Sequence, residues 1–199
     1  MTPEVGLWNV ANVLTLARIV LVPVFVAFLL AGGTAWRLIA LATFCAASLT
    51  DLFDGRLARS RGLVTDFGKL ADPIADKALT GAALICLSAL GELPWWVTGV
   101  IMFREIGVTA LRFWVIRQGV IAASRGGKAK TLLQVIAICL YVLPSSLSPP
   151  GIVRGLLMAA AVVVTVVTGF DYVLQAVRLH RSGPAGQSGP AGQSDLGEA

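Results

Sequence analysis

The chain has 199 residues, of which 56% are hydrophobic and only 14% are charged. A soluble domain carries about 25% charged residues, so this composition excludes an ordinary soluble protein and indicates an integral membrane protein. The net charge of +5 comes from basic residues in short segments between apolar runs. This distribution is typical of the positive-inside rule and not of a nucleic-acid-binding surface, so we expect no nucleic-acid partner.

Six apolar runs are long enough to cross a membrane as helices, because a span requires about 17 to 25 residues. In chain order they cover about residues 12–31, 36–56, 73–91, 94–116, 130–148 and 152–176. Turns rich in glycine and proline separate some of the runs, and two longer basic segments, 57–72 and 117–129, separate the others. The sequence therefore predicts an all-α integral membrane protein with six transmembrane helices.

The basic residues predict which side of the membrane each loop faces. Most of them lie in the two long breaks or after the last run, at Arg56, Arg59, Arg61, Lys69, Arg117, Arg125, Lys128, Arg178 and Arg181. Near the turns at the opposite ends of the runs lie only Arg37 and Arg154. Cytoplasmic loops are enriched in Lys and Arg, so both termini and both long loops are predicted to be cytoplasmic. We expect a multi-pass protein of the cell inner (cytoplasmic) membrane, surrounded by membrane lipids.

One predicted transmembrane domain, residues 12–178, lies between two shorter segments. Residues 1–11 include Trp8 and are predicted to lie at the membrane interface, where tryptophan is favoured. From Ser182 onward the chain repeats the unit SGPAGQ, which offers little apolar surface to bury. We therefore expect residues 179–199 to form a disordered tail.

Four carboxylates recur on helical spacing where the second run ends and the third begins. Asp51 and Asp54 are three residues apart, and Asp72 and Asp76 are four residues apart. Either interval places both side chains on one face of a helix. Four carboxylates that come together repel one another unless cations lie between them, and hard oxygen ligands suit Mg²⁺ or Mn²⁺. We predict a site for two such ions at the cytoplasmic end of these helices.

Small residues and one arginine accompany the carboxylates. Gly55, Ala58 and Gly68 would let a bulky ligand approach the backbone closely. Arg59 offers a planar fork for a phosphate oxygen. Together with metal ions, these residues indicate a diphosphate site. Asp66 departs from the helical spacing, so we interpret it as a solvated loop residue or a helix cap.

This stretch resembles, at every fixed position, the signature of the CDP-alcohol phosphatidyltransferases. In this chain it reads Asp51-x2-Asp54-Gly55-x2-Ala58-Arg59-x8-Gly68-x3-Asp72-x3-Asp76. The resemblance implies a six-helix membrane enzyme, usually a homodimer, that displaces CMP from a CDP-linked lipid with an alcohol acceptor. It also implies metal ligation by Asp51, Asp54, Asp72 and Asp76, with Asp76 as the general base. The implied CDP-binding residues are Asp51, Asp54, Gly55, Ala58, Arg59 and Gly68.

Three further segments resemble the bacterial phosphatidylglycerophosphate synthases, a branch of that family. They are NVANVLTLARI (9–19), MFREIGVTALR (102–112) and GKAKTLLQ (127–134). The first segment keeps Asn9 and Asn12, which we expect to support the site, but has Ala11 where proline is usual. The resemblance implies transfer of a phosphatidyl group from CDP-diacylglycerol to sn-glycerol 3-phosphate, which yields phosphatidylglycerophosphate and CMP.

Basic residues near the carboxylates independently favour an anionic acceptor. Arg104 and Arg112 lie inside a predicted span, where an unpaired cation is costly. Arg125 and Lys128 approach the same cytoplasmic end, although they also suit a purely topological role. A basic cluster would hold the phosphate of glycerol 3-phosphate and leave its hydroxyl facing the diphosphate. The predicted acceptor-phosphate residues are Arg104, Arg112, Arg125, Lys128 and Lys130.

Other functions remain open at the level of sequence. Within the family, the alternatives are a phosphatidylinositol phosphate synthase, whose acceptor is also anionic, and a cardiolipin synthase. Outside it, an intramembrane prenyltransferase also binds a diphosphate through aspartates and Mg²⁺, but the chain lacks a second, widely separated aspartate motif. A non-enzymatic cation carrier would need acidic residues near mid-membrane, whereas these carboxylates cluster at one end of the helices.

Overall fold

The structure is a computed structural model that describes residues 10–61, 66–115 and 125–181, with side chains over 13–50, 74–111 and 130–177. It consists of six helices in the described ranges: α1 (Val10–Ala31), α2 (Thr34–Arg61), α3 (Asp66–Ala89), α4 (Trp95–Val115), α5 (Arg125–Val142) and α6 (Gly151–Arg181). The prediction of an all-α protein is confirmed. The expected interfacial segment and disordered tail lie outside the described residues, apart from short overlaps with α1 and α6.

Two predicted breaks differ from the structure. Helix α2 continues to Arg61 and α3 begins at Asp66, so the break expected over 57–72 is largely helical and Asp66 starts a helix. Helix α5 begins at Arg125, inside the break expected over 117–129. Apolarity marks only the part of a helix that suits lipid, and good helix formers such as Leu, Ala, Arg and Lys extend helices beyond it. The carboxylate signature is therefore carried mainly by two helices and not by a loop.

Helix α5 ends at Val142, earlier than expected, because Pro144 disfavours helical geometry in the residue before it. Arg37 of α2 stabilises this end. Its Nε donates to the carbonyl of Val142 at 3.1 Å, and its Nη2 donates to the carbonyl of Tyr141 at 2.9 Å. The same guanidinium forms two hydrogen bonds with Glu92, at 2.6 and 2.8 Å. Arg37 thus satisfies carbonyls that the end of a helix leaves without partners.

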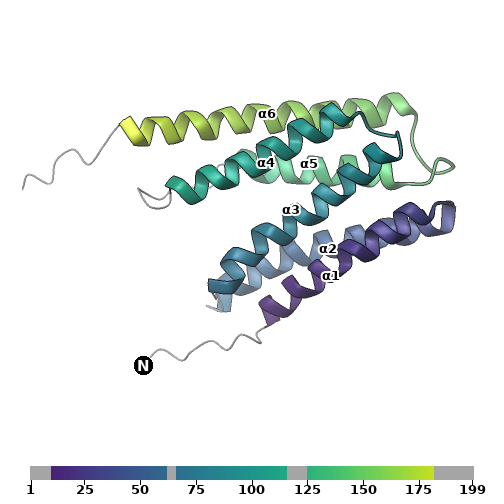
Figure 1. Cartoon of the computed structure of the whole chain (residues 1–199), viewed down its shortest axis with the longest axis horizontal. Helices are drawn as coiled ribbons and strands as arrows, with labels where there is room; N and C mark the ends of the chain where they lie inside the picture. The colour runs from purple at the N-terminus through teal and green to yellow at the C-terminus, as the bar shows by residue number, and fades with distance from the viewer. Residues whose placement is uncertain (1–9, 62–65, 116–124, 182–199) are drawn as a thin grey trace, which may run out of the picture.

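Successive helices alternate in direction, so their ends gather on two sides of the molecule (Figure 1). The turns from α1 to α2, α3 to α4 and α5 to α6 lie toward the right in this view. Tight turning is possible at Gly32 and Gly33, whose φ angles of 70° and 76° are favoured only for glycine. The start of α1, the start of α3 and the ends of α2, α4 and α6 lie toward the opposite side.

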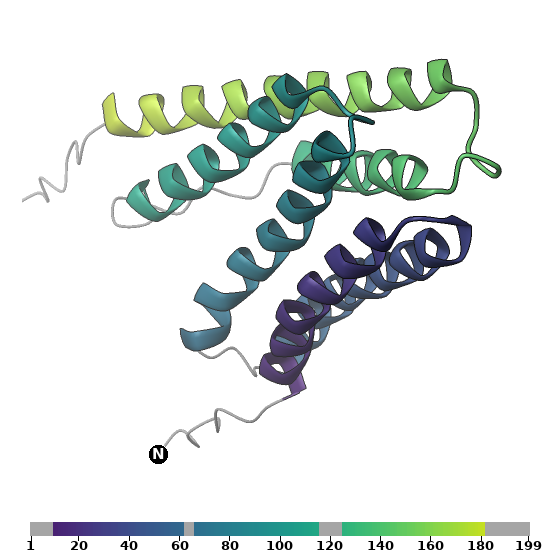
Figure 2. The same cartoon turned by 45° about the vertical axis from the view of Figure 1, so that its right-hand side comes forward.

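Helix α3 connects the two halves of the bundle. Helices α1 and α2 pack against each other on one side, and α6 packs against α4 and α5 on the other. Helix α3 crosses between them and contacts α1, α2, α4 and α5 (Figures 1 and 2). Because Asp72 and Asp76 belong to α3, this half of the signature lies on the helix that connects the two halves of the bundle.

The bundle buries an apolar core and exposes an apolar surface. Phe25 of α1 and Phe44 of α2 are fully buried, with ring centroids 5.5 Å apart. On the outside, Phe103 of α4 and Phe170 of α6 are 82% and 68% exposed, as expected for residues that face lipid.

Two helical segments in the described ranges, Val13–Ala31 and Gly151–Val177, are long and apolar enough to cross a membrane. These features agree with a membrane protein. Six crossings and cytoplasmic termini stay predictions.

Candidate active site

A cleft between α3, α4 and α5 gathers polar side chains in the centre of the bundle. Its lining residues are Asp76, Lys77, Thr80, Met102, Glu105, Lys130, Thr131, Gln134 and Val135. The α3 and α5 members each span one turn, with Thr80 four residues after Asp76 and Gln134 four residues after Lys130. Residues at this interval share a face of a helix, so α3 and α5 each turn one polar stripe toward the other.

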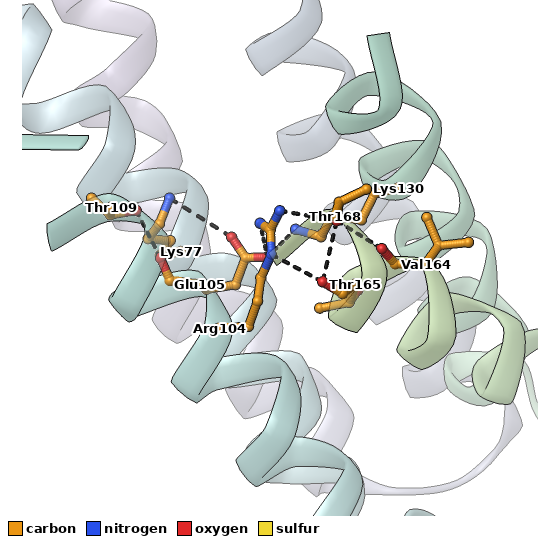
Figure 3. A network of polar contacts seen from close by, with 8 residues as sticks. All are labelled: Lys77, Arg104, Glu105, Thr109, Lys130, Val164, Thr165 and Thr168. Atoms are coloured by element: carbon orange, nitrogen blue, oxygen red, sulfur yellow. Dashed lines mark hydrogen bonds and ion pairs between the residues drawn. The ribbon is translucent and has the colours of Figure 1, made fainter. Parts of the chain in front are cut away.

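Glu105 is the centre of the charge network in this cleft (Figure 3). Its side chain is buried, and Lys130 donates to its Oε1. The ammonium of Lys77 lies 3.9 Å from Oε2, and the guanidinium of Arg104 lies 3.5 Å from Oε1. A buried carboxylate is stable only when it is paired and hydrogen-bonded, and here three cations surround it.

The described side chains leave a surplus of positive charge around the cleft. The cations of Lys77, Arg104 and Lys130 face two carboxylates, those of Asp76 and Glu105. A partly buried surplus of this sign attracts an anionic ligand. The cleft therefore combines a carboxylate of the signature with a place for an anion.

Arg104 turns most of its donors toward α6. Its Nε donates to the carbonyl of Thr165 at 3.2 Å, and its Nη2 donates to the hydroxyl of Thr168 at 3.0 Å. The guanidinium carbon also lies 5.9 Å from the ring centroid of Tyr172. Gly169 leaves room for this arrangement, because a Cβ there would lie 3.0 Å from Cγ of Arg104. Arg104 does not line the cleft; these contacts indicate that it joins α4 to α6 beside it, and its predicted phosphate-binding role stays a prediction.

Asp76 is the one predicted metal ligand whose side chain the structure describes. It is half-buried and lines the cleft. Asp51 and Asp54 belong to the last three turns of α2 and Asp72 to the first two of α3, and these helices contact each other. Carboxylate oxygens are the ligands that Mg²⁺ and Mn²⁺ prefer, and metal binding by these four residues stays a prediction. No group of three or more candidate ligands occurs among the described side chains, which include only Asp76 of the four.

The other predicted site residues lie outside the described side chains, and their roles stay predictions. Helix α2 contains Gly55, Ala58 and Arg59, helix α3 contains Gly68, and helix α4 contains Arg112. The remaining residues of this group are Arg125 and Lys128 in α5, Asn12 in α1, and Asn9, which precedes α1. The structure describes the side chains of two of the five predicted acceptor-phosphate residues, Arg104 and Lys130, and of these two Lys130 lines the cleft.

Sequence reasoning missed several residues of this region. Lys77, Thr80 and Gln134 line the cleft but were not predicted as site residues. Their spacing could have identified them: Lys77 and Thr80 follow Asp76 by one and four residues, and Gln134 follows Lys130 by four. Arg18 of α1 was also missed, although it is only 1% exposed. An arginine within an apolar run is costly to bury, and that cost was the signal that could have identified it.

Known proteins match this chain over most of its length. The model of the CDP-alcohol phosphatidyltransferase family matches residues 8–167. A protein of Mycobacterium tuberculosis named probable phosphatidylglycerophosphate synthase is 56% identical over 173 residues, which cover 85% of this chain and 82% of that protein.

Two further relatives carry the name CDP-diacylglycerol–glycerol-3-phosphate 3-phosphatidyltransferase. The protein of Bacillus subtilis is 42% identical over 183 residues, covering 83% of this chain and 94% of its own length. The protein of Escherichia coli is 38% identical over 137 residues, covering 66% of this chain and 75% of its own. These matches argue against the two alternatives outside the family, the prenyltransferase and the cation carrier. The chain belongs to the CDP-alcohol phosphatidyltransferase family.

Proposed function

We propose that the protein transfers the phosphatidyl group of CDP-diacylglycerol to sn-glycerol 3-phosphate, which yields phosphatidylglycerophosphate and CMP. The names of relatives that match most of the chain support this reaction. The observation that carries the proposal is the shared cleft of Asp76 and Lys130. A carboxylate that can accept a hydroxyl proton lies there beside a cation that can hold a phosphate.

The donor site is formed by the signature residues. Gly55, Ala58 and Gly68 allow the CDP moiety to approach the backbone of α2 and α3, and Arg59 binds a phosphate oxygen through its planar fork. The acyl chains of the donor lie along the apolar outer faces of the helices. The family signature supports these assignments.

Asp51, Asp54, Asp72 and Asp76 would hold two Mg²⁺ or Mn²⁺ ions. When bound, such ions neutralise the diphosphate and stabilise the charge on the departing CMP. The four carboxylates supply the oxygen ligands that these ions prefer.

The two ammonium groups that line the cleft, those of Lys77 and Lys130, support an anionic acceptor. Lys130 and Lys77 provide ammonium groups for the phosphate of glycerol 3-phosphate, and Glu105 keeps both in position through its two carboxylate oxygens. A phosphate held there leaves the far hydroxyl of the acceptor free to reach Asp76. Arg112, Arg125 and Lys128 extend the same basic region in this proposal.

Asp76 accepts the proton of the attacking hydroxyl. The acceptor oxygen then forms a bond to the phosphorus that carries the diacylglycerol, and the bond from that phosphorus to the CMP oxygen breaks. Proton removal at a positioned carboxylate contributes about 10²- to 10⁴-fold to such a reaction. Asp76 therefore acts at the reacting oxygen, whereas the lysines act only on the distal phosphate.

The expected setting is the cytoplasmic membrane, with the reactive end of the helices facing the cytoplasm and the protein acting as a homodimer. The positive-inside distribution of Lys and Arg supports the orientation, and the resemblance to the family supports the dimer.

The proposal is tested by CMP release with one acceptor at a time. Purified protein, CDP-diacylglycerol and Mg²⁺ are incubated with glycerol 3-phosphate, inositol 1-phosphate or phosphatidylglycerol. Glycerol 3-phosphate is expected to give the highest kcat/KM. A higher value with inositol 1-phosphate or phosphatidylglycerol would instead identify a phosphatidylinositol phosphate synthase or a cardiolipin synthase.

A further inference from the structure

Gln134 is a buried amide in the cleft that the proposed reaction has not yet used. It is 4% exposed and lines the cleft from α5. In the part of the chain that the structure describes, its side chain forms no hydrogen bond. Its amide is not among the described polar groups that are fully buried without a partner, so the amide reaches the open space of the cleft. Gln134 therefore has both a donor and an acceptor available to a molecule that enters the cleft.

Gln134 lies close to the residues that take part in the proposed reaction. It lies one helical turn after Lys130, about 6 Å farther along α5. Thr80 lies one turn after Asp76 on α3 and also lines the cleft. Both helices run toward the side where the α3–α4 and α5–α6 turns lie (Figures 1 and 2). Gln134 and Thr80 therefore form one polar layer of the cleft, one helical turn away from the layer formed by Asp76 and Lys130.

The chemistry of this layer suits a neutral hydroxyl group. A phosphate is best held by cations, which lie at Lys77 and Lys130. An amide and a hydroxyl group each donate and accept hydrogen bonds, so they match an alcohol that does the same. Met102 and Val135 provide apolar wall beside them, which suits a carbon chain.

Glycerol 3-phosphate has one group for each of these places. Its phosphate goes to the lysines and its reacting hydroxyl to Asp76, which leaves the hydroxyl on the central carbon. We propose that Gln134, with Thr80 across the cleft, binds this non-reacting hydroxyl and so selects glycerol 3-phosphate over phosphorylated alcohols that lack it. This inference rests on the proposed function and adds a specificity-determining residue to it.

The test compares two acceptors that differ only in this group, sn-glycerol 3-phosphate and propane-1,3-diol monophosphate. A site built to hydrogen-bond a hydroxyl discriminates strongly against an analogue without it. The unaltered protein is expected to prefer glycerol 3-phosphate by about three- to tenfold in kcat/KM, since one hydrogen bond contributes about that factor. Gln134→Leu is expected to bring the ratio of the two kcat/KM values close to one, mainly by slowing the reaction of glycerol 3-phosphate.

Leu132→Ala is the matched control, because Leu132 lies on the same helix but is 60% exposed and outside the cleft. It is expected to keep the ratio of the unaltered protein. If Gln134→Leu does not fold, the near-isosteric Gln134→Met and Thr80→Val variants carry the same comparison, and each is expected to lower the ratio.

The outcomes separate this inference from the proposed function. No CMP release from glycerol 3-phosphate by the unaltered protein would refute the proposed function itself. Normal turnover of glycerol 3-phosphate without preference over the analogue would refute the role of Gln134 alone. So would a Gln134 variant that slows both acceptors equally, because a purely structural role lowers both rates and leaves their ratio unchanged.

Discussion

Lys130 of α5 donates to the carboxylate of Glu105 on α4, and the two residues are only 5% and 8% exposed. Long side chains of this kind are rarely buried unless they are paired. The pair fixes the ammonium group of Lys130 inside the cleft that also contains Asp76. The cleft in which we propose that Asp76 accepts a proton and Lys130 binds a phosphate is thus shaped by three helices.

Lys130→Met is predicted to weaken acceptor binding. The variant removes the ammonium group that the phosphate meets but keeps a side chain of similar length. We expect kcat/KM for glycerol 3-phosphate to fall by about 100-fold, since hydrogen bonds to charged groups are worth about 1.5–3 kcal/mol. The loss is not complete because Lys77 still contributes a cation to the cleft. KM for CDP-diacylglycerol should stay within about twofold. Initial-rate kinetics with each substrate varied in turn check this, and an equal loss for both substrates would argue against an acceptor role.

Asp76→Asn is predicted to abolish most of the activity, because the amide cannot accept the hydroxyl proton. We expect the rate of CMP release to fall by about 10³-fold or more. Asp171→Asn is the control: Asp171 is an exposed α6 residue that accepts a hydrogen bond from Gln175 and does not line the cleft. The general-base assignment fails if the Asp76 variant retains the activity of the Asp171 variant.

Chelation of divalent metal is predicted to stop the reaction. After treatment with EDTA the protein should release no CMP, and Mg²⁺ or Mn²⁺ should restore release, because the diphosphate charge is otherwise unscreened. Titration of each metal against the rate checks this. Full activity in the presence of excess chelator would remove the metals from the mechanism.

Arg104→Met separates two roles for this arginine. If Arg104 mainly joins α4 to α6, the loss of its bonds to Thr165 and Thr168 should lower the free energy of unfolding by about 1–3 kcal/mol. KM for glycerol 3-phosphate should then change little at temperatures where the variant is folded. Melting in detergent and acceptor kinetics measure the two effects separately. A large rise in KM without loss of stability would favour the phosphate-binding role.

The sequence predicts the number, order and approximate position of the helices, because apolar runs and glycine- or proline-rich turns are local features. It fails over 57–61 and 66–72, where polar but helix-favouring residues continue α2 and α3 beyond their apolar parts. It also places the end of α5 too late, because the expected run extends past Pro144, which disfavours helical geometry in the residue before it. The bonds from Arg37 that stabilise this end are long-range and leave no local signal.

The candidate site is also predictable only in part, because the sequence does not show which helices face each other. Asp76 and Lys130 stand out as ionisable residues at the ends of apolar runs, and both line the cleft. Gln134 and Thr80 are ordinary polar residues until α3 and α5 are known to face each other. Arg104 shows the opposite case. Its charge within an apolar run predicts that it binds a phosphate, but the sequence does not show that α6 supplies hydrogen-bond acceptors for it.

The most direct measurement is a competition in one vessel, with purified protein, CDP-diacylglycerol, Mg²⁺ and equal concentrations of glycerol 3-phosphate, inositol 1-phosphate and phosphatidylglycerol. Mass spectrometry identifies the lipid product while CMP is quantified in the aqueous phase. Phosphatidylglycerophosphate is expected as the dominant product, in an amount equal to the CMP released. A different dominant lipid, or no CMP above the level of the Asp76→Asn variant, would contradict the proposed reaction.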